Sequence, residues 1–260
     1  CSIKFQDGDL LKKSRMEMRF TRGALISMIF QDPMTALNPV MTVGNQVLES
    51  LKIHHTGEMS PAEMDARVDE LFTLVGIPPS RKKEYPHQFS GGMKQRIVIA
   101  IALACEPLLM IADEPTTALD VTIQAQVLAL MEDLKQKMKM SMIMITHDLG
   151  IVAEVCDRVA IMYAGEIVEQ GSAKDFFEGN QHHPYTRGLF GALPDLNSQA
   201  HRLNPIPGLM PDPTNLPAGC KFHPRCPKAM DICAVEAPAT YEKNGHQISC
   251  HLMKDLGGRI

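Results

Sequence analysis

The sequence predicts an α/β fold built on a parallel sheet. Two short apolar stretches, 24–30 and 108–115, have the length and composition of buried strands, and a third, 140–146, follows a long helical pattern. The stretch 108–115 ends in Asp113 and Glu114. Carboxylates there lie at the edge of an open α/β sheet where ligands bind, and they suit a Mg²⁺-nucleotide site, one acid holding the metal and the other polarising water. The alternative is a strand followed by an acidic turn.

The composition indicates one large domain, or one domain with a small appendage. The chain has 260 residues, 45% of them hydrophobic, and its net charge is −4, which excludes nucleic-acid binding driven by bulk charge. The longest strictly apolar run, 97–105, is too short to span a bilayer, and no secretory signal pattern is present. We therefore expect a soluble, cytoplasmic protein. Because the chain starts at Cys1, we expect a fragment of a longer protein.

The first 24 residues predict an irregular start with one short helix. The segment 8–14 superficially resembles the end of a phosphate-binding loop, but the glycines that such a loop needs are missing, and no Gly-Lys-Ser or Gly-Lys-Thr occurs in the chain. The strand at 24–30 leads to Gln31 and a polar, proline-bracketed loop. A glutamine at that point can reach a metal-bound water. The alternative is an ordinary turn residue.

A helical insertion of about residues 40–105 is predicted to interrupt the sheet. The segment 43–54 has a helical pattern, and a second helix begins with Ser60 as N-cap, Pro61 in its first turn and Glu63 closing a capping box. Its apolar stripe ends at Gly76. Such a stripe is more often core than a partner-binding surface.

A pair of glycines precedes the apolar helix that ends near Cys105. Ser90 is in position to cap this helix, and Gly91 and Gly92 leave backbone N–H groups open to close approach. The positive end of a helix suits a phosphate. A plain tight turn is the alternative that the local sequence leaves open.

The remaining elements continue the alternation of helix and strand. Asp120 can cap a helix that runs to about Lys139, and the strand 140–146 delivers His147 to the sheet edge, where an imidazole can meet a phosphate. The alternative is a histidine of no consequence at the start of a helix. Two strands joined by a tight turn follow at 158–163 and 165–170, then two short helices at 173–179 and 184–193, and prolines crowd the chain from Pro194 onward, which predicts a linker or a wrapped extension.

The order and spacing of these motifs resemble the ATP-binding-cassette (ABC) ATPases over residues 24 to about 175. The resemblance implies a P-loop-type fold in which Glu114 is the general base and His147 steadies the transition state. It implies Mg²⁺ binding by Asp113 and Gln31. Nucleotide contacts are implied for Gln31 of the Q-loop, Asp113 of the Walker B motif, Asp120 of the D-loop, and Ser90, Gly91, Gly92 and Gln95 of the signature motif.

Longer matches are similar to the ATPase subunits of bacterial dipeptide and oligopeptide importers. They include Phe-Gln-Asp-Pro-Met-Thr-Ala-Leu-Asn-Pro, Ala-Asp-Glu-Pro-Thr-Thr-Ala-Leu-Asp-Val-Thr and His-His-Pro-Tyr-Thr. The resemblance implies a head-to-tail dimer with a second ATPase subunit, two transmembrane permease subunits, an indirect link to a solute-binding protein, no nucleic acid, and a peripheral location on the cytoplasmic face of the membrane. Importers of nickel or another solute share many of these motifs. Soluble ABC ATPases of DNA repair or translation are a weaker alternative.

One part of the ABC pattern, the phosphate-binding Walker A loop with its strand and helix, is absent. Loss of these central elements is expected to leave a large apolar face exposed. The chain is then either a fragment of a full ATPase, which we favour, or a degenerate, non-catalytic subunit that supplies only its signature motif to a partner. In either case, we expect the isolated 260-residue chain to bind ATP poorly and to hydrolyse none.

Four cysteines mark the C-terminal extension, which we assign to residues 194–260, after an ATPase core at 1–193. Their spacing lacks the short Cys-x2–4-Cys hook of structural zinc sites, and disulfides are not expected in a cytosolic ATPase. A [4Fe–4S] cluster is favoured, because four thiolates suit it and the importer resemblance points to one. Zinc with mixed Cys and His ligands stays open through His223, His246 and His251. The predicted cluster ligands are Cys220, Cys226, Cys233 and Cys250.

Overall fold

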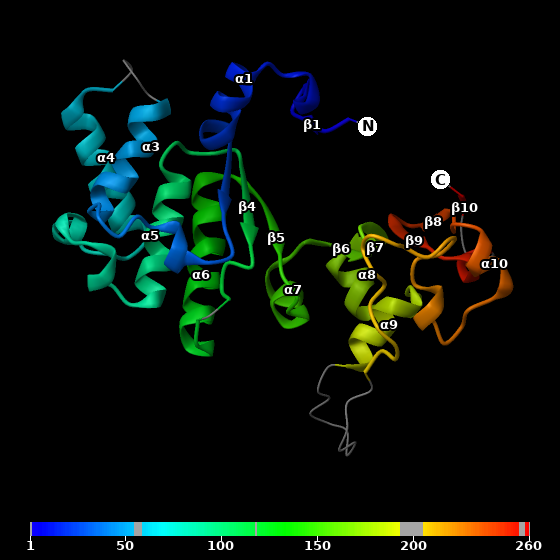
Figure 1. Ribbon diagram of the computed structural model, residues 1–260. Helices are drawn as coiled ribbons and strands as arrows, with labels where there is room; N and C mark the ends of the chain where they lie inside the picture. The colour runs from blue at the N-terminus through cyan, green and yellow to red at the C-terminus, as the bar shows by residue number, and fades with distance from the viewer. Residues whose placement is uncertain (1, 55–58, 118, 193–204, 255–257, 260) are drawn as a thin grey trace. The chain divides into compact units, whose positions relative to one another are not determined.

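The computed structural model describes residues 2–54, 59–117, 119–192, 205–254 and 258–259 (Figure 1). The chain divides into two compact units, 1–148 and 149–260. The predicted boundary between residues 193 and 194 lies outside the described residues and stays a prediction. None of the helices in the described ranges combines the length and the apolar character needed to cross a membrane.

The first unit is built on the three predicted parallel strands. They are β3 (Ile26–Ile29), β4 (Leu109–Asp113) and β5 (Ser141–Ile145), in the order β3-β4-β5. Since all three run in the same direction, their carboxyl ends meet at one edge of the sheet. The polar residues that follow each strand are therefore delivered to the same place.

Within the described part of the first unit, helices cover one face of this sheet and not the other. The helices α5 (Gly91–Leu103) and α6 (Val121–Met138) share a buried cluster with Ile29 and Met110 (Figure 1). Across the sheet, the paired residues Met28, Ile111 and Ile143 share the opposite face. Met28, Ile143 and Ile145 of this face are 39%, 51% and 48% exposed. Parallel sheets usually have both faces covered, so this exposed apolar face is unusual.

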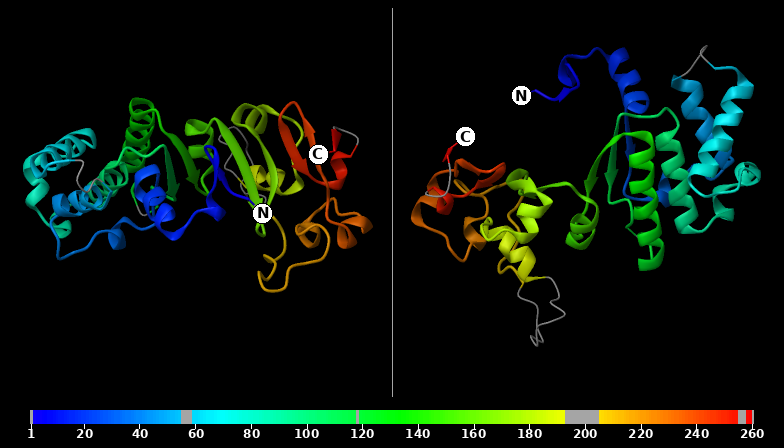
Figure 2. Two further views of the ribbon diagram at one scale, coloured as in Figure 1. Left: turned by 90° about the horizontal axis from the view of Figure 1, so that it is seen from above. Right: turned by 180° about the vertical axis from the view of Figure 1, so that it is seen from behind.

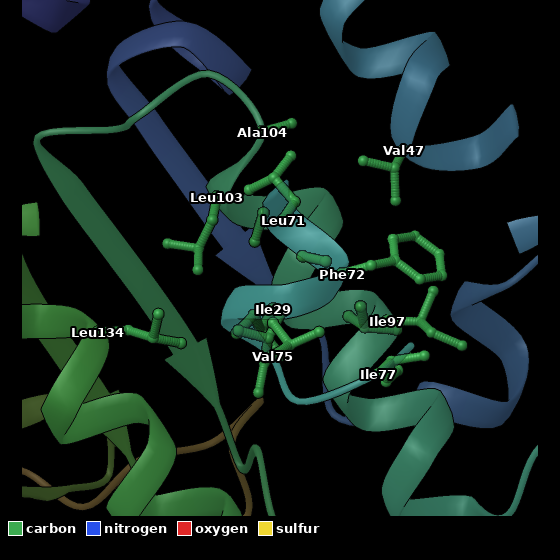
Figure 3. Close-up of a cluster of buried hydrophobic side chains, with 14 of the residues drawn as sticks. Ile29, Val47, Leu71, Phe72, Val75, Ile77, Ile97, Leu103, Ala104 and Leu134 are labelled. Atoms are coloured by element: carbon green, nitrogen blue, oxygen red, sulfur yellow. The ribbon is translucent and has the colours of Figure 1, made fainter. Parts of the chain in front are cut away.

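The segment between β3 and β4 contains helices where the sequence indicated them. It includes α3 (Val43–His54), α4 (Pro61–Leu74), two short 3₁₀ turns, η3 (Pro79–Lys83) and η4 (Pro86–Gln88), and then α5. Ser60 and Glu63 make the predicted capping box. Figure 3 shows Leu71, Phe72 and Val75 among side chains of α3 and α5, so the apolar stripe is core. A single helical turn, α2 (Pro33–Ala36), lies within the segment predicted as a loop.

The N-terminal residues do not form a phosphate-binding loop. They form a small hairpin of β1 (Lys4–Phe5) and β2 (Gly8–Asp9), a 3₁₀ turn η1 (Leu10–Lys12), and α1 (Arg15–Phe20), which Ser14 and Glu17 cap. An irregular turn, η2 (Thr21–Leu25), leads into β3.

The second unit contains a five-stranded antiparallel sheet in the order β10-β8-β9-β7-β6. The predicted hairpin is β6 (Arg158–Tyr163) and β7 (Glu166–Ser172), and the C-terminal extension adds β8 (Thr240–Lys243), β9 (His246–Ser249) and β10 (Gly258–Arg259) (Figure 2). The extension is thus part of a sheet and more than a linker, because β9 pairs directly with β7. The helices of this unit are α7 (Leu149–Val155), α8 (Ala173–Glu178), α9 (Pro184–Gly191) and α10 (Asp231–Val235), with 3₁₀ turns η5 (His223–Arg225) and η6 (His251–Met253).

Candidate functional site

The edge of the β3-β4-β5 sheet brings three of the predicted residues together. Gln31 follows β3, Glu114 follows β4 and His147 follows β5. Gln31 Nε2 donates a hydrogen bond of 2.9 Å to Glu114 Oε2, and His147 Nδ1 lies 3.0 Å from Glu114 Oε1. The Glu114 carboxylate is the centre of this group, and each of its oxygens faces one of the other two side chains.

The backbone turns sharply at Glu114. Its φ is 45°, in the left-handed region that a residue with a side chain rarely adopts. The Glu114 N–H donates to the Ile145 carbonyl of β5 at 2.9 Å, so the turn is tied to the neighbouring strand. Strain of this kind persists only where the surroundings hold it, and it is common at functional sites. Here it directs the carboxylate toward Gln31 and His147.

Thr117 is a fourth member of the site that the sequence reasoning did not single out. Its hydroxyl donates to Glu114 Oε2 at 2.8 Å. Its spacing from Glu114 could have indicated this contact, since a hydroxyl three residues after an acidic residue can reach back across a tight turn. Thr117 and Gln31 therefore share one carboxylate oxygen.

Three side-chain donors shape the electrostatics of Glu114. Hydrogen bonds from His147, then Thr117, then Gln31 lower the pKa of the Glu114 carboxyl below its usual value. The carboxylate is partly buried, whereas His147 is exposed. A carboxylate with both oxygens occupied is a weak base. In this arrangement Glu114 is therefore a poor proton acceptor. A ligand that took one of its three donors away would raise the pKa of the carboxyl and make it a stronger base.

Asp113 occupies the last position of β4, opposite Ile145 of β5. By strand alternation it shares the exposed face with Ile111 and Ile143. The Gln31 amide is turned toward Glu114 in this structure. The role of Asp113 and Gln31 as Mg²⁺ ligands stays a prediction, and oxygen ligands at a strand end are the type that Mg²⁺ takes.

The signature segment forms the start of α5. The Ser90 hydroxyl caps the helix by accepting from Met93 N–H at 3.4 Å. The two glycines differ in their surroundings. A Cβ added at Gly92 would lie 2.4 Å from Ile123 Cγ2, so Gly92 permits α5 and α6 to pack closely, whereas a Cβ at Gly91 would be in ordinary contact with Leu119 at 3.7 Å. Packing thus explains Gly92 and does not explain Gly91.

Gln95 and Asp120 act as structural supports near the site. Gln95 is fully buried, and its Nε2 donates a 2.6 Å hydrogen bond to the carbonyl of Pro115, next to Glu114. Asp120 caps α6 by accepting from Ile123 N–H at 3.0 Å, as predicted. Direct nucleotide contacts by Gln95 and Asp120 stay predictions.

The four C-terminal cysteines form no disulfide bonds with one another. Burial raises the pKa of Cys250 to about 11 and raises the pKa values of Cys220 and Cys226. Within the ranges that the structure describes, no three of the four Sγ atoms lie mutually within 4.8 Å. A zinc ion with Zn–S bonds of about 2.3 Å holds its sulfurs only about 3.8 Å apart. The four sulfurs are therefore not gathered at zinc spacing in this structure, and the choice between a cluster and zinc stays a prediction.

The histidines that kept a mixed zinc site open are engaged elsewhere. His223 Nδ1 hydrogen-bonds the carbonyl of Cys220 at 2.9 Å, His251 Nε2 the carbonyl of Glu236 at 2.9 Å, and His246 Nε2 the carboxylate of Glu169 at 2.9 Å. Each contact uses one ring nitrogen, so a mixed set of cysteine and histidine ligands stays open as a prediction.

Two family models match the chain. "ABC transporter" covers residues 2–117, and "Oligopeptide/dipeptide transporter, C-terminal region" covers residues 168–233. The second match spans most of β7 and three of the four C-terminal cysteines, Cys220, Cys226 and Cys233. It therefore associates the predicted extension with proteins that transport peptides.

Curated relatives cover nearly the whole chain. The dipeptide transport ATP-binding protein DppD of Bacillus subtilis (strain 168) is 53% identical over 96% of this chain and 75% of its own length. The oligopeptide transport ATP-binding protein AppD of the same organism is 50% identical over 98% of this chain and 78% of its own length. DppD of Escherichia coli (strain K12) is 48% identical over 99% of this chain and 79% of its own length.

Solved structures share the fold. The chain resembles cbiO1 from Clostridium perfringens, part of the ABC transporter complex cbiONQ, with a TM-score of 0.59, 30% identity and coverage of 67% of each chain. It also resembles a dimer of the ATP-binding cassette MJ0796 bound to ADP and Pi in a post-hydrolysis state, with a TM-score of 0.57, 26% identity and coverage of 65% of this chain and 72% of that one.

Proposed function

This chain belongs to the ATP-binding subunits of the dipeptide and oligopeptide ABC transporters, and from that premise we propose that it energises the import of small peptides by ATP hydrolysis. The observation that carries the proposal is the convergence of Gln31 and His147 on Glu114. At the ends of parallel strands, this group provides a base in Glu114, an amide in Gln31, and in His147 a hydrogen-bond donor that can stabilise the negative charge of a phosphate.

In the proposed reaction, Glu114 accepts a proton from water as the water oxygen attacks the γ-phosphorus. The new O–P bond forms while the bond from the γ-phosphorus to the bridging oxygen of ADP breaks. His147 stabilises the charge that develops on the phosphoryl oxygens. Asp113 and Gln31 would hold Mg²⁺, which would supply positive charge to neutralise the phosphates. ADP and phosphate leave as products.

Activation requires that Glu114 lose some of its donors. In this structure His147, Thr117 and Gln31 occupy the carboxylate and lower its pKa. A bound nucleotide offers charged phosphate oxygens, which are strong competing acceptors for an exposed imidazole. Movement of His147 and Gln31 toward the nucleotide would free Glu114 to take the proton. The site then becomes basic only when substrate is present.

The phosphate-binding loop for this reaction is proposed to come from outside the 260 residues. No Gly-Lys-Ser or Gly-Lys-Thr occurs in the sequence, and the apolar sheet face beside Asp113 is exposed. The signature motif (Ser90, Gly91, Gly92) is proposed to complete the ATP site of a second ATPase subunit, packed head to tail. A chain that acts only in this way, as a non-catalytic partner, is the second candidate.

The partners and location follow from the same proposal. Two transmembrane permease subunits bind this chain at the cytoplasmic face of the membrane, where it is peripheral, and a solute-binding protein delivers the peptide from the other side. Nickel or another solute is the alternative cargo. The matched C-terminal region, at residues 168–233, supports peptide.

The extension is proposed to hold a [4Fe–4S] cluster through Cys220, Cys226, Cys233 and Cys250, with zinc as the alternative. The buried thiols must lose their protons on binding, so assembly is favoured by rising pH. The cluster is proposed to stabilise the extension. Electron transfer is not part of the proposal.

Peptide uptake in a bacterial strain that lacks its dipeptide ATP-binding protein tests this function. The complete reading frame of this protein, expressed with its neighbouring permease genes, is expected to restore uptake of a labelled dipeptide. The Glu114→Gln variant, made at equal level, is expected to restore none. Restored nickel uptake without peptide uptake would replace the proposed cargo, and equal uptake by the variant would contradict the role of Glu114.

A further inference from the structure

A second group of titratable side chains lies in the C-terminal unit, apart from the four cysteines. Glu169 of β7 contacts His182, which precedes α9, and His246 of β9. His182 Nδ1 lies 2.8 Å and His246 Nε2 lies 2.9 Å from the same atom, Glu169 Oε1. The side chains of Glu169, His182 and His246 are 0%, 7% and 12% exposed. A carboxylate buried this deeply requires a compensating positive charge.

Hydrogen bonds to His182 Nε2 and Glu169 Oε2 hold the other two atoms, His182 Nδ1 and Glu169 Oε1, in place. His182 Nε2 lies 2.8 Å from the carbonyl oxygen of Gly179, and Glu169 Oε2 accepts the His183 N–H at 2.7 Å. Metal-binding histidines in proteins commonly donate their other ring nitrogen to a carbonyl in this way, and ligating carboxylates are hydrogen-bonded through their free oxygen. These contacts leave His182 Nδ1 and Glu169 Oε1 facing each other.

The contacts of His182 require a proton or a metal ion between its Nδ1 atom and Glu169 Oε1. A carbonyl oxygen only accepts, so the proton of a neutral His182 ring lies on Nε2, toward Gly179. Its Nδ1 then presents a lone pair to Glu169 Oε1 across 2.8 Å. Two acceptors at this distance repel each other unless a proton or a metal ion lies between them. The site is therefore built to hold positive charge.

We propose that Glu169, His182 and His246 form a binding site for one divalent cation of the zinc type, through Oε1, Nδ1 and Nε2. Two imidazole nitrogens and one carboxylate oxygen are a ligand set that Zn²⁺ takes, with a fourth position left for water or another ligand. Mg²⁺ and Ca²⁺ prefer oxygen ligands and do not suit it.

The spacing of the three ligand atoms is close to what such an ion requires. All three lie within 4.8 Å of one another, and ligands about 2.0–2.1 Å from a tetrahedral ion lie about 3.4 Å apart. Binding therefore needs the two close contacts to widen by roughly 0.5 Å as the shared proton leaves. His246 and Gly179 also line a cavity of about 320 Å³, together with Asp175 and Tyr241.

The proposed ion would join segments that are far apart in sequence. It links β9 of the extension to β7, and both to the segment before α9. His246 packs against Gly171, where an added Cβ would lie 3.0 Å from His246 Cδ2, so its ring has little freedom to turn away. The proposed ion would thus stabilise the fold of the second unit, and this role does not depend on the nucleotide chemistry proposed above.

Co²⁺ binding to the whole 260-residue chain, freed of metal by a chelator under anaerobic conditions, tests this inference. Co²⁺ bound by thiolates absorbs strongly in the near ultraviolet, whereas Co²⁺ bound by nitrogen and oxygen does not, so the cysteine segment is distinguished. One equivalent of nitrogen- and oxygen-bound Co²⁺ is expected, and Zn²⁺ is expected to displace it. In His246→Gln and Glu169→Gln its Kd is expected to rise at least about tenfold.

His87→Gln is the matched control, since His87 is exposed in the first unit; it is expected to keep the wild-type affinity. Glutamine at position 246 can still donate to Glu169, so the metal-free fold should persist, and circular dichroism checks this. X-ray absorption at the zinc edge of the wild type gives a readout that needs no variant. Wild-type chain that binds only thiolate-bound metal, or equal affinity in His246→Gln and wild type, would overturn the inference.

Discussion

Gln95 Nε2 donates a 2.6 Å hydrogen bond to the carbonyl oxygen of Pro115. This contact joins the helix of the signature motif to the residue after Glu114. Both groups are buried, so the bond is shielded from competing water. A shift of α5 must therefore be transmitted to the turn that holds the proposed base.

Gln95→Ala is expected to destabilise the first unit by about 1–3 kcal/mol, because it leaves the Pro115 carbonyl buried without its donor. Unfolding in urea measures this. The matched control is Gln136→Ala, which removes an exposed bond to Glu132 and is expected to change stability by no more than about 0.5 kcal/mol. Equal effects of the two substitutions would contradict the role given to Gln95.

The Glu114 carboxyl is expected to titrate below the usual value for glutamate, about 4.3. Its donors stabilise the charged form, so the stability they contribute is present above that value and is lost as the pH falls through the lower, folded-state pKa. His147→Ala is expected to raise this pKa more than Thr117→Ala does, because His147 is the larger cause. Carbon-13 NMR of the carboxyl follows the titration. A pKa that both substitutions leave unchanged would refute this account.

The two signature glycines are expected to respond differently to alanine. Gly92→Ala places a Cβ against Ile123 and should lower the free energy of unfolding, by about 1–3 kcal/mol. Gly91→Ala has room for its methyl group and should leave stability nearly unchanged while weakening ATP binding by the assembled ATPase pair. Denaturant unfolding and nucleotide binding separate the two effects. Loss of stability in Gly91→Ala would contradict the assignment.

Iron and sulfide are expected in anaerobically purified protein and are expected to fall sharply in Cys226→Ser. Removing one of four thiolates leaves the proposed cluster without a ligand. Cys105→Ser is the matched control, since Cys105 is a separate thiol whose pKa burial raises to about 11, and its iron content should equal that of the wild type. Zinc at the cysteines, with neither iron nor sulfide, would exclude the cluster.

The isolated 260-residue chain is expected to hydrolyse no ATP, because it lacks a loop to bind the β- and γ-phosphates. Phosphate release measured over a range of chain concentrations checks this, with Glu114→Gln as the comparison. Activity in the wild type that the substitution abolishes would show that these residues suffice for catalysis.

Local signals in the sequence predicted much of the first unit. Ser60, Ser90 and Asp120 cap helices where the sequence indicated, since a cap depends on residues within one turn. The convergence on Glu114 was predictable because it needs only three parallel strands. The contribution of Thr117 and the left-handed backbone of Glu114 were not, because they depend on how the turn closes.

The second unit was harder to predict. The pairing of β9 with β7 joins residues such as Gln170 and Gln247, and no pattern in a short, mixed-polarity strand specifies so distant a partner. The contact of Glu169 with His246 could not be predicted for the same reason, because the two residues are far apart in the sequence. His182 appeared in the sequence only as part of a family motif, and its contacts exist only once the sheet has formed.

The exposed face of the β3-β4-β5 sheet also determines how the chain behaves in solution. Met28, Ile143 and Ile145 of this face are exposed hydrophobic side chains. The isolated chain is therefore expected to bind dyes such as ANS and to self-associate as its concentration rises. Because the driving force is hydrophobic, sulfate should promote this association and low concentrations of urea should reverse it before the fold is lost. Colloidal stability, more than folding, will set the concentration at which the chain can be studied alone.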